Sequence, residues 1–416
     1  MFALIRAWTV RLLSDTGRAK PRLNTVSSTP PFPKRREGFF MSKKGKTFTQ
    51  NTPSNIDDQG LSWALREFSC PDRLVRIGTS FSGIGAIEYA FKRLGIRSKI
   101  VFAGDIDDNC KKSYFANYDI DESRWHTDIH DFDARPYKNK IDLFVGGAPC
   151  QAFSIVGDQR GFEDTRGTLF REFARVVKEC RPKVFIFENV QGLFKHDNGR
   201  TWEVIYKTFQ DYCGYDVHYQ LLNARDYGVP QTRERLYCIG FRSKTRFQYP
   251  APIPLRYRMY DFLEDCTDSP YYDAVKNAKV LANDLVFPIS EVDEKYYLSE
   301  KVAKYVLCSG TKTFRTPIKT DLDIARPLLQ SMHKMHRAGV DNYVSYNKSK
   351  GIDGLRKLTP RECLRLMGFR DDFKIVVSNT HAYMEAGNSI VVDVLIALLK
   401  QLDITKYGVT DEEQER

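Results

Sequence analysis

The amino-acid sequence predicts an α/β fold with a mostly parallel sheet and a smaller second domain inserted near its end. From Leu74 onward, short segments rich in β-branched and aromatic residues alternate with helical patterns, as in βαβ units. Between residues 246 and 355 this alternation stops, and Tyr, Pro, Lys and Asp become frequent. Helical periodicity returns at residues 359–367 and 390–402, so we expect the first domain to resume there.

The α/β part begins with a strand and a helix joined by a glycine-rich loop, and its clearest helical pattern is at residues 169–180. There, apolar residues at positions 169, 170, 173, 176 and 177 follow the spacing of one helix face. Ligands of such sheets bind beyond the carboxyl ends of the strands, so the residues after each strand are the first candidates for a site. The sequence predicts strands at residues 74–79, 99–103, 141–145, 184–187 and 236–241, and helices at 87–94 and 169–180.

Composition excludes several classes of protein. The chain has 416 residues, 42% of them hydrophobic, which is enough to bury a large core over two domains. No apolar run approaches the roughly 20 residues needed to cross a bilayer, so a membrane protein is excluded. The nine cysteines form no C-x-x-C pair, which favours a reducing cytoplasm over a disulfide or zinc framework. We interpret His333 and His336 as surface histidines and expect no metal.

The net charge of +11 suggests an acidic partner such as nucleic acid, but its distribution weakens that inference. Residues 1–60 hold 11 Lys and Arg against four Asp and Glu, so only +4 remains for the rest of the chain. These residues are rich in Pro, Ser and Thr, which predicts a disordered tail. Met41 opens MSKKGK, so residues 1–40 are either a mis-called extension of the reading frame or an Arg-rich targeting peptide.

A glycine-rich loop follows the first strand in SFSGIGAIEYAF. Gly83 and Gly85 let the backbone turn tightly and approach a ligand, and the next helix offers free N–H groups at its start. Asp105 lies 22 residues beyond Gly83, at the end of the next predicted strand. An acidic residue there commonly binds the ribose hydroxyls of an adenosine-containing cofactor. The pattern indicates such a cofactor, with an ordinary solvated loop carboxylate as the alternative for Asp105.

A second group of reactive side chains is predicted at the same sheet edge. Cys150 follows the strand at 141–145 in GGAPCQAFSIVG, and Glu188 follows the next strand in FENV. Arg233 and Arg235 stand in QTRER before the last strand and join them if that strand has the right orientation. A thiolate beside an arginine can add to an electron-poor carbon, and a protonated carboxyl can make a ring carbon more electrophilic. Together, these four side chains favour transfer of a cofactor group to an activated ring. The alternative for Cys150 is that it serves only as a small hydrophobic residue, as most buried cysteines do.

These motifs resemble those of the C5-cytosine DNA methyltransferases, most closely the bacterial enzymes of type II restriction-modification systems. The resemblance covers about residues 74–402, and AFSIVGDQRGFEDTRGTLF and LTPRECLRLMGF extend it. It implies an α/β, Rossmann-like S-adenosylmethionine-dependent methyltransferase domain with a smaller inserted target-recognition domain. The five motifs, in the family's order, are SFSGIG, GGAPCQAFSIVG, FENV, QTRERLY and AGNSIVV.

The resemblance implies that S-adenosylmethionine is the cofactor and binds between the glycine-rich loop and Asp105. Ile106 stands where the family often has an aromatic residue against the adenine, so weaker stacking is expected. Thr79 replaces the family's usual aspartate before the loop, and Asp128 with Ile129 is expected near the adenine amino group. The residues matched to cofactor binding are Phe81, Gly83, Ile84, Gly85, Asp105, Ile106, Asp128, Ile129, Asn388 and Ser389.

The same resemblance assigns the reactive residues. Cys150, with Gln151 beside it, would attack C6 of a cytosine, and Glu188 would engage N3 and the exocyclic amine. Arg235 would hold O2, with Arg233 as a supporting partner of a phosphate or carboxylate. C5 then takes the methyl group, and loss of its proton expels the cysteine. A base stacked in a duplex offers no such approach, so we expect the target cytosine in a specific double-stranded DNA sequence to be flipped out.

The resemblance also divides the chain. Residues 61–245 and 356–405 are expected to form the catalytic domain, residues 246–355 the target-recognition domain, and residues 406–416 a C-terminal tail. Residues 151–168 are expected to close over the base as a lid. We expect a cytoplasmic monomer without membrane contact, and a cognate restriction endonuclease for the same site as a partner. Candidate DNA contacts are Arg160, Arg166, Arg315, Lys334 and Arg337.

Three alternatives remain open. The first is an RNA cytosine methyltransferase of the same fold, since some relatives modify transfer RNA, although the long insert argues against it. The second is a catalytically silent homologue that binds DNA, which has no need of the thiol. The third is a nucleotide-dependent oxidoreductase, which explains the glycine-rich loop and Asp105 but leaves PCQ, ENV and QTRER without a role.

Overall fold

The computed structural model describes most of the chain, and the described residues lie within Pro53–Arg416. The predicted tail at 1–60, the predicted nucleophile Cys150, its neighbour Gln151 and the rest of the predicted lid lie outside the described residues. The described residues are 63–149, 169–265, 287, 290–309, 315–346 and 354–414.

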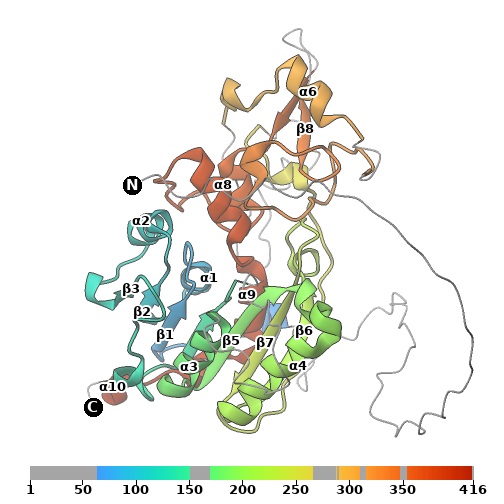
Figure 1. The fold of residues 1–416 in the computed structure, drawn as a ribbon. Helices are drawn as coiled ribbons and strands as arrows, with labels where there is room; N and C mark the ends of the chain where they lie inside the picture. The colour runs from blue at the N-terminus through green and yellow to red at the C-terminus, as the bar shows by residue number, and fades with distance from the viewer. Residues whose placement is uncertain are drawn as a thin grey trace, which may run out of the picture. The chain divides into compact units, whose positions relative to one another are not determined.

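A seven-stranded sheet forms the centre of the described part, in the strand order β3-β2-β1-β4-β5-β7-β6 (Figure 1). Strands β1 to β5 pair in parallel, whereas β7 is antiparallel to both of its neighbours, β5 and β6. The predicted mostly parallel α/β sheet is therefore confirmed. The strands are β1 (Val75–Ser80), β2 (Ser98–Gly104), β3 (Trp125–His126), β4 (Leu143–Gly146), β5 (Val184–Val190), β6 (Asp216–Asn223) and β7 (Glu234–Phe241).

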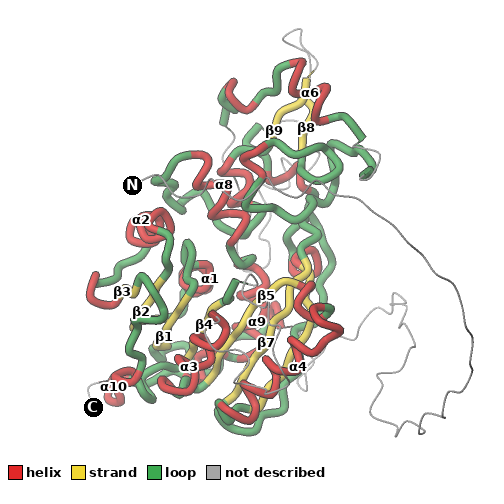
Figure 2. Tube along the Cα trace, in the orientation of Figure 1, coloured by secondary structure: helices red, strands yellow, loops and turns green. Residues whose placement is uncertain are grey.

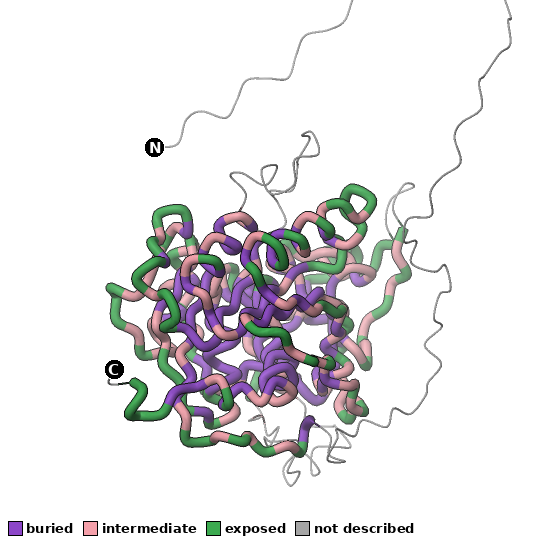
Figure 3. Tube along the Cα trace, turned by 90° about the horizontal axis from the view of Figure 1, so that it is seen from below, coloured by how far each residue is buried: buried purple, intermediate pink, exposed green. Residues whose placement is uncertain are grey.

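Helices cover both faces of the sheet, because side chains alternate between the two faces along each central strand. In β5, Val184 and Ile186 belong to one core cluster, and Phe185 and Phe187 belong to the other. Helices α1 and α9 contribute to the first cluster and α3 and α4 to the second, and Figure 2 shows these helices beside the strands. Figure 3 shows that buried residues concentrate in the interior of the described part. These helices are α1 (Ala86–Leu94), α3 (Leu169–Cys180), α4 (Arg200–Lys207) and α9 (Val392–Leu402).

Three of the remaining helices, α2, α7 and α8, begin at side-chain caps. Asp107 caps α2 by accepting a hydrogen bond from the Asn109 N–H over 2.8 Å. Thr359 and Glu362 form a capping box at the start of α7, with a proline at its first position, so the helix begins at Pro360. It ends at Arg365 and is therefore shorter than the predicted 359–367. The remaining helices are α2 (Asp108–Asn117), α6 (Glu300–Val306), α7 (Pro360–Arg365), α8 (Asn379–Asn388) and α10 (Asp411–Gln414).

The most apolar helical stretch of the described residues is Asn379–Leu402, which contains α8 and α9. By length and composition alone it is long enough to cross a membrane. Its most apolar window is 78% buried inside the fold, however, which is typical of a core helix. Burial of α9 against α1 in the first core cluster therefore accounts for much of this composition.

A second, two-stranded antiparallel sheet consists of β8 (Tyr343–Tyr346) and β9 (Gly354–Lys357). A buried ion pair joins it to α7, because the Arg356 guanidinium lies 2.8 Å from the Glu362 carboxylate. The assignment of residues 246–355 as a target-recognition domain remains a prediction. The small core cluster around this sheet consists of Leu298, Val306, Ala338, Tyr343 and Leu355.

Candidate active site

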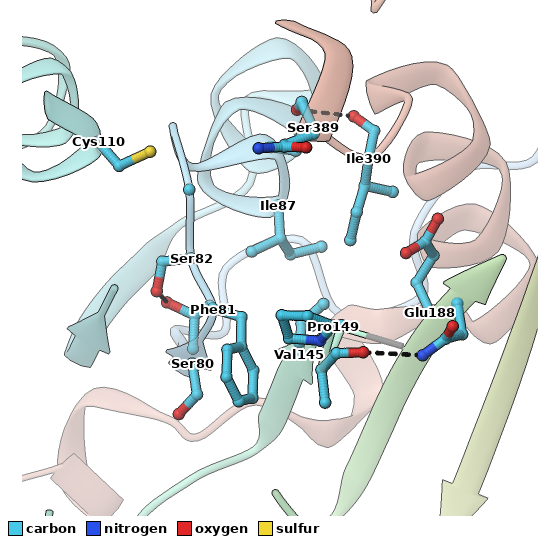
Figure 4. Close-up of a pocket in the computed structure, with 18 of the residues that line it drawn as sticks. Ser80, Phe81, Ser82, Ile87, Cys110, Val145, Pro149, Glu188, Ser389 and Ile390 are labelled. Atoms are coloured by element: carbon cyan, nitrogen blue, oxygen red, sulfur yellow. Dashed lines mark hydrogen bonds between the residues drawn. The ribbon is translucent and has the colours of Figure 1, made fainter. Parts of the chain in front are cut away.

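A cavity of about 460 Å³ lies at the carboxyl ends of β1, β4 and β5, the sheet edge at which the sequence predicts a ligand (Figure 4). Pro149, directly before Cys150 in the chain, lines it. Residues predicted to bind a cofactor and residues predicted to react therefore share one cavity. The predicted site residues that line it are Phe81, Gly83, Glu188, Arg233, Arg235, Asn388 and Ser389.

Asp105 holds the glycine-rich loop after β1 at this cavity. The Gly83 N–H donates to Oδ2 of Asp105 over 2.9 Å, and the Asp107 N–H donates to Oδ1 over 3.0 Å. Burial raises the pKa of Asp105. Gly83 has a φ of +53° and no atom within 4 Å of the position of a Cβ, so its backbone borders open space. Phe81 has a φ of +55°, which is strained for a residue with a side chain, and this strain is typical of a ligand-binding loop.

Gly85 serves packing, because it does not line the cavity. Its φ is +78°, and a Cβ there would stand 2.3 Å from the ring of Tyr118. We expect Gly85→Ala to lower the free energy of unfolding by roughly 2–4 kcal/mol through backbone strain and this clash. Urea unfolding measures the loss, with Gly192→Ala as the control, since a Cβ at Gly192 meets nothing within 4 Å. Unchanged stability in Gly85→Ala would contradict the packing role.

The loop after β4 leads to the predicted nucleophile. Asn189 holds this loop, because its Nδ2 donates to the carbonyl of the residue before Pro149 over 2.9 Å. Gly147 leaves the space above Glu188 open, since a Cβ there would stand 3.1 Å from Oε2 of that carboxylate. A flat ring can therefore approach the Glu188 side chain without meeting a side chain from this position.

Glu188 and Arg235 form an ion pair in the cavity wall, with 3.4 Å between Oε1 and Nε. The reversed direction of β7 makes this possible, because β7 starts where β5 ends and places Arg235 opposite Val190. Burial raises the pKa of Glu188, and the positive charges of Arg235 and Arg233 oppose that effect. A buried carboxyl that keeps its proton to higher pH than usual is suited to proton donation.

Arg233 has partners other than the predicted phosphate or carboxylate. It is only 4% exposed, and its guanidinium donates to the carbonyls of Leu328 and Gly387 over 2.9 Å and of Ser389 over 3.0 Å. Its charge acts on Glu188 from within the wall. The predicted role beside a phosphate or carboxylate stays a prediction, and the three carbonyl partners could not be expected from QTRER, which carries no information about segments far along the chain. Arg233 joins the cavity wall to the inserted segment.

The junction between α8 and α9 completes the cavity. Asn388 is exposed and lines it, and the Ser389 hydroxyl donates to the carbonyl of Ile390 over 3.1 Å. Gln330, from the inserted segment, also lines the cavity and was not predicted. A Cβ at Gly387 would stand 2.2 Å from the Gln330 backbone N, so the glycine allows the inserted segment to reach the cavity.

Besides Gly85 and Asp105, four predicted cofactor residues are not among those that line the cavity. Ile106 is 74% exposed. The Asp128 side chain is 42% exposed, and its carboxylate accepts hydrogen bonds from the His130 backbone N–H over 2.9 Å and from the His130 ring over 2.7 Å. The side chains of Ile84 and Ile129 are buried in the two core clusters, so only their main-chain atoms are available to a ligand.

Three titratable groups of the cavity wall were missed by sequence reasoning: Glu88, Cys110 and Glu385. The signal for Glu88 is its position inside the apolar segment IEYAF, where a buried carboxyl is costly without a partner. Among the described residues, no group of three or more His, Cys, Asp or Glu side chains is arranged to hold a metal ion.

Comparisons with known proteins agree on one family. Residues 76–403 match the family described as C-5 cytosine-specific DNA methylase. The chain is 36% identical over 335 residues to type II methyltransferase M1.ScrFI of Lactococcus lactis subsp. cremoris, over 77% of this chain and 76% of the relative. It is 35% identical over 318 residues to type II methyltransferase M.HhaI of Haemophilus parahaemolyticus, over 76% and 90%. The crystal structure of S. pombe Dnmt2 methyltransferase has the same fold, with a TM-score of 0.60 and 21% identity over 79% of this chain and 98% of the other.

Proposed function

Because the chain belongs to the C-5 cytosine-specific DNA methylase family, we propose that it transfers a methyl group from S-adenosylmethionine to C5 of a cytosine in a short, specific sequence of double-stranded DNA. The observation that supports this most directly is the ion pair of Glu188 and Arg235, which lines the same cavity as the glycine-rich loop. A carboxyl and a guanidinium side by side match the N3 and O2 atoms of cytosine.

The residues of the cavity fit S-adenosylmethionine. Asp105 lies at the glycine-rich loop, where its carboxylate can accept hydrogen bonds from ribose hydroxyls, and Gly83 borders open space. Phe81, Asn388 and Ser389 would hold the cofactor from the loop and from the α8–α9 junction. When bound, S-adenosylmethionine supplies an electrophilic methyl group on a positively charged sulfur.

The chain's own residues then activate the base. Glu188 gives a proton to N3 and Arg235 binds O2, so that electrons are drawn away from C6. The Cys150 thiolate forms a bond to C6, and the electron pair moves to C5, which becomes the nucleophile. As C5 takes the methyl group, the proton on N3 returns to Glu188. C5 then gives its own proton to a water molecule, and the electrons of that C–H bond expel the Cys150 thiolate. The enzyme returns to its starting state.

The remaining parts of the chain support access and choice of substrate. Residues 246–355 are proposed to recognise the DNA sequence, and Arg233 ties this segment to the cavity through Leu328. The target cytosine leaves the helix at a cost of a few kcal/mol. We place the enzyme in a cytoplasmic restriction-modification system, in which methylation protects host DNA from a cognate endonuclease.

Bisulfite sequencing tests this function directly. DNA from a methylation-free host that expresses the wild-type chain is expected to show protected cytosines in one short motif. DNA from a host that expresses Cys150→Ser is expected to be fully converted, because the serine hydroxyl is a far weaker nucleophile than a thiolate at neutral pH. Western blotting of both chains controls for expression.

The outcomes also separate the alternatives. Full conversion with both chains, combined with labelled methyl transfer to RNA, would establish the RNA enzyme instead. DNA binding without any methyl transfer would establish the silent homologue. Protection that persists in Cys150→Ser would exclude the covalent route while leaving the methyltransferase assignment intact.

A further inference from the structure

The charged side chains of the cavity form two groups. Glu188 lies 3.4 Å from Arg235 and feels the charge of Arg233 as well. Glu88 and Glu385 line the same cavity, yet within the described part of the chain neither pairs with a Lys, Arg or His side chain. A buried carboxylate without a positive neighbour is costly, so these two groups are suited to a cationic ligand.

Glu88 is only 5% exposed and reaches the cavity from α1. Its Oε1 accepts hydrogen bonds from the Tyr114 hydroxyl over 2.7 Å and from the Thr79 hydroxyl over 3.1 Å. Its Oε2 is buried and has no hydrogen-bond partner among the described residues. One oxygen is therefore held by the protein, whereas the other lacks a hydrogen-bond donor among the described residues.

Glu385 lines the same cavity from α8 and is 6% exposed. The Ser113 hydroxyl donates to its Oε1 over 2.8 Å, and Ser113 directly precedes Tyr114, the partner of the other glutamate. Cys110, which lies on α2 one turn before Ser113, also lines the cavity. Asp107, which caps α2, adds a further negative charge near Glu385. The described side chains around Glu385 are therefore acidic or neutral.

Any subsite for the cofactor rests on the proposed function, in which S-adenosylmethionine binds in this cavity. We propose that Glu88 and Glu385 form the subsite for the α-ammonium group at the amino-acid end of the cofactor. Oε2 of Glu88 accepts a hydrogen bond from the ammonium, and Glu385 contributes a second negative charge. Arg235, beside Glu188, would repel an ammonium at the other end of the cavity. The separation of charge thus orients the cofactor, with its methyl group toward Glu188 and the loop at Pro149.

The subsite gives cofactor affinity a distinctive pH profile. Burial raises the pKa of Glu385 to about 7, and burial also raises the pKa of Glu88. A carboxyl attracts an ammonium only when ionised, so affinity is expected to increase as the pH rises through about 7. It is expected to fall again near pH 8, where α-amino groups lose their proton. Burial raises the thiol and phenol pKa values of Cys110, Tyr114 and Tyr118, so these neighbours stay neutral over this range.

Calorimetric titration of the full chain tests the proposal with three ligands. S-adenosylmethionine has both positive groups, S-adenosylhomocysteine keeps the ammonium alone, and 5′-methylthioadenosine has neither. Glu88→Gln is expected to weaken binding of the first two equally, by about 10- to 100-fold, the usual loss for a charge-assisted hydrogen bond. It is expected to leave 5′-methylthioadenosine unchanged. Glu385→Gln is expected to remove the rise in affinity near pH 7, and Glu122→Gln, an exposed glutamate paired with Lys111 on α2, is the control.

Three results would overturn the assignment. A loss limited to S-adenosylmethionine would place the positive sulfur, rather than the ammonium, at Glu88. An equal loss for all three ligands would show that Glu88 only supports the pocket. Unchanged affinities in both variants would remove the subsite altogether. If the wild-type chain binds none of the three ligands, the proposed function itself fails, so the two failures are distinguishable.

Discussion

Replacing Glu188 with Gln is expected to lower kcat for methyl transfer by about 10²- to 10⁴-fold, the contribution typical of a positioned proton donor. The amide keeps the shape of the side chain and can still accept a hydrogen bond from Arg235, but it cannot give a proton to N3. Single-turnover transfer of a labelled methyl group to DNA measures the chemical step. Glu203→Gln, an exposed glutamate on α4 that pairs with Lys207, is the matched control.

The pH dependence of the wild type follows from the same residue. Because burial raises the pKa of Glu188, its protonated form persists to higher pH than that of an exposed glutamate. Activity is expected to fall as the pH rises through this pKa, because Glu188 then loses the proton that it donates. The free energy of unfolding is expected to fall over the same pH range, because the folded protein binds this proton more tightly than the unfolded chain does. In Glu188→Gln this descending limb should be absent. A variant that retains the wild-type kcat and pH profile would contradict the proton-donor role.

Replacing Arg233 with Ala is expected to lower the free energy of unfolding by roughly 3–5 kcal/mol, as when one partner of a buried charged network is removed. The substitution leaves the carbonyls of Leu328, Gly387 and Ser389 without their donors, and each buried group left unpaired costs about 1–3 kcal/mol. It also removes a positive charge near Glu188, whose pKa should rise further. Urea unfolding followed by circular dichroism measures the loss.

Two further variants separate the causes of that loss. Arg233→Lys keeps a positive charge but has a single ammonium in place of the guanidinium fork, so an intermediate loss is expected. Arg135→Ala removes an exposed arginine that pairs with Asp133 and is expected to change stability by less than about 1 kcal/mol. An Arg233→Ala variant as stable as Arg135→Ala would show that the three carbonyls are satisfied in another way.

The sequence alone predicted the fold class, the family and most of the central sheet. The helix predicted at residues 169–180 has the bounds of α3, because its apolar spacing defines a complete buried face. The family resemblance, based on five motifs in order, is confirmed by the match over residues 76–403. Motifs at the ends of parallel strands are predictable in this way, since neighbouring strands of one direction bring their carboxyl ends to the same edge. The individual roles of the cofactor and catalytic residues remain predictions.

Several elements escaped prediction for local reasons. Strand β3 has two residues, too few to show an alternating pattern. Strand β6 includes exposed polar residues at the edge of the sheet, so its apolar signal is weak. Helix α2 has few buried residues and is recognised mainly by its Asp107 cap. Elements that are very short or only partly buried therefore cannot be predicted from the periodicity of apolar residues.

The sequence by itself determined which residue types gather at the sheet edge, whereas the tertiary structure decided which of them touch. Only the reversed direction of β7 places Arg235 beside Glu188. The hydrogen bonding of Thr79 likewise depends on Glu88 from the following helix, and that of Arg233 on carbonyls from distant segments. The physical reason is that periodicity records whether a side chain is buried, while the partners that satisfy a buried polar group come from contacts between segments far apart in the chain.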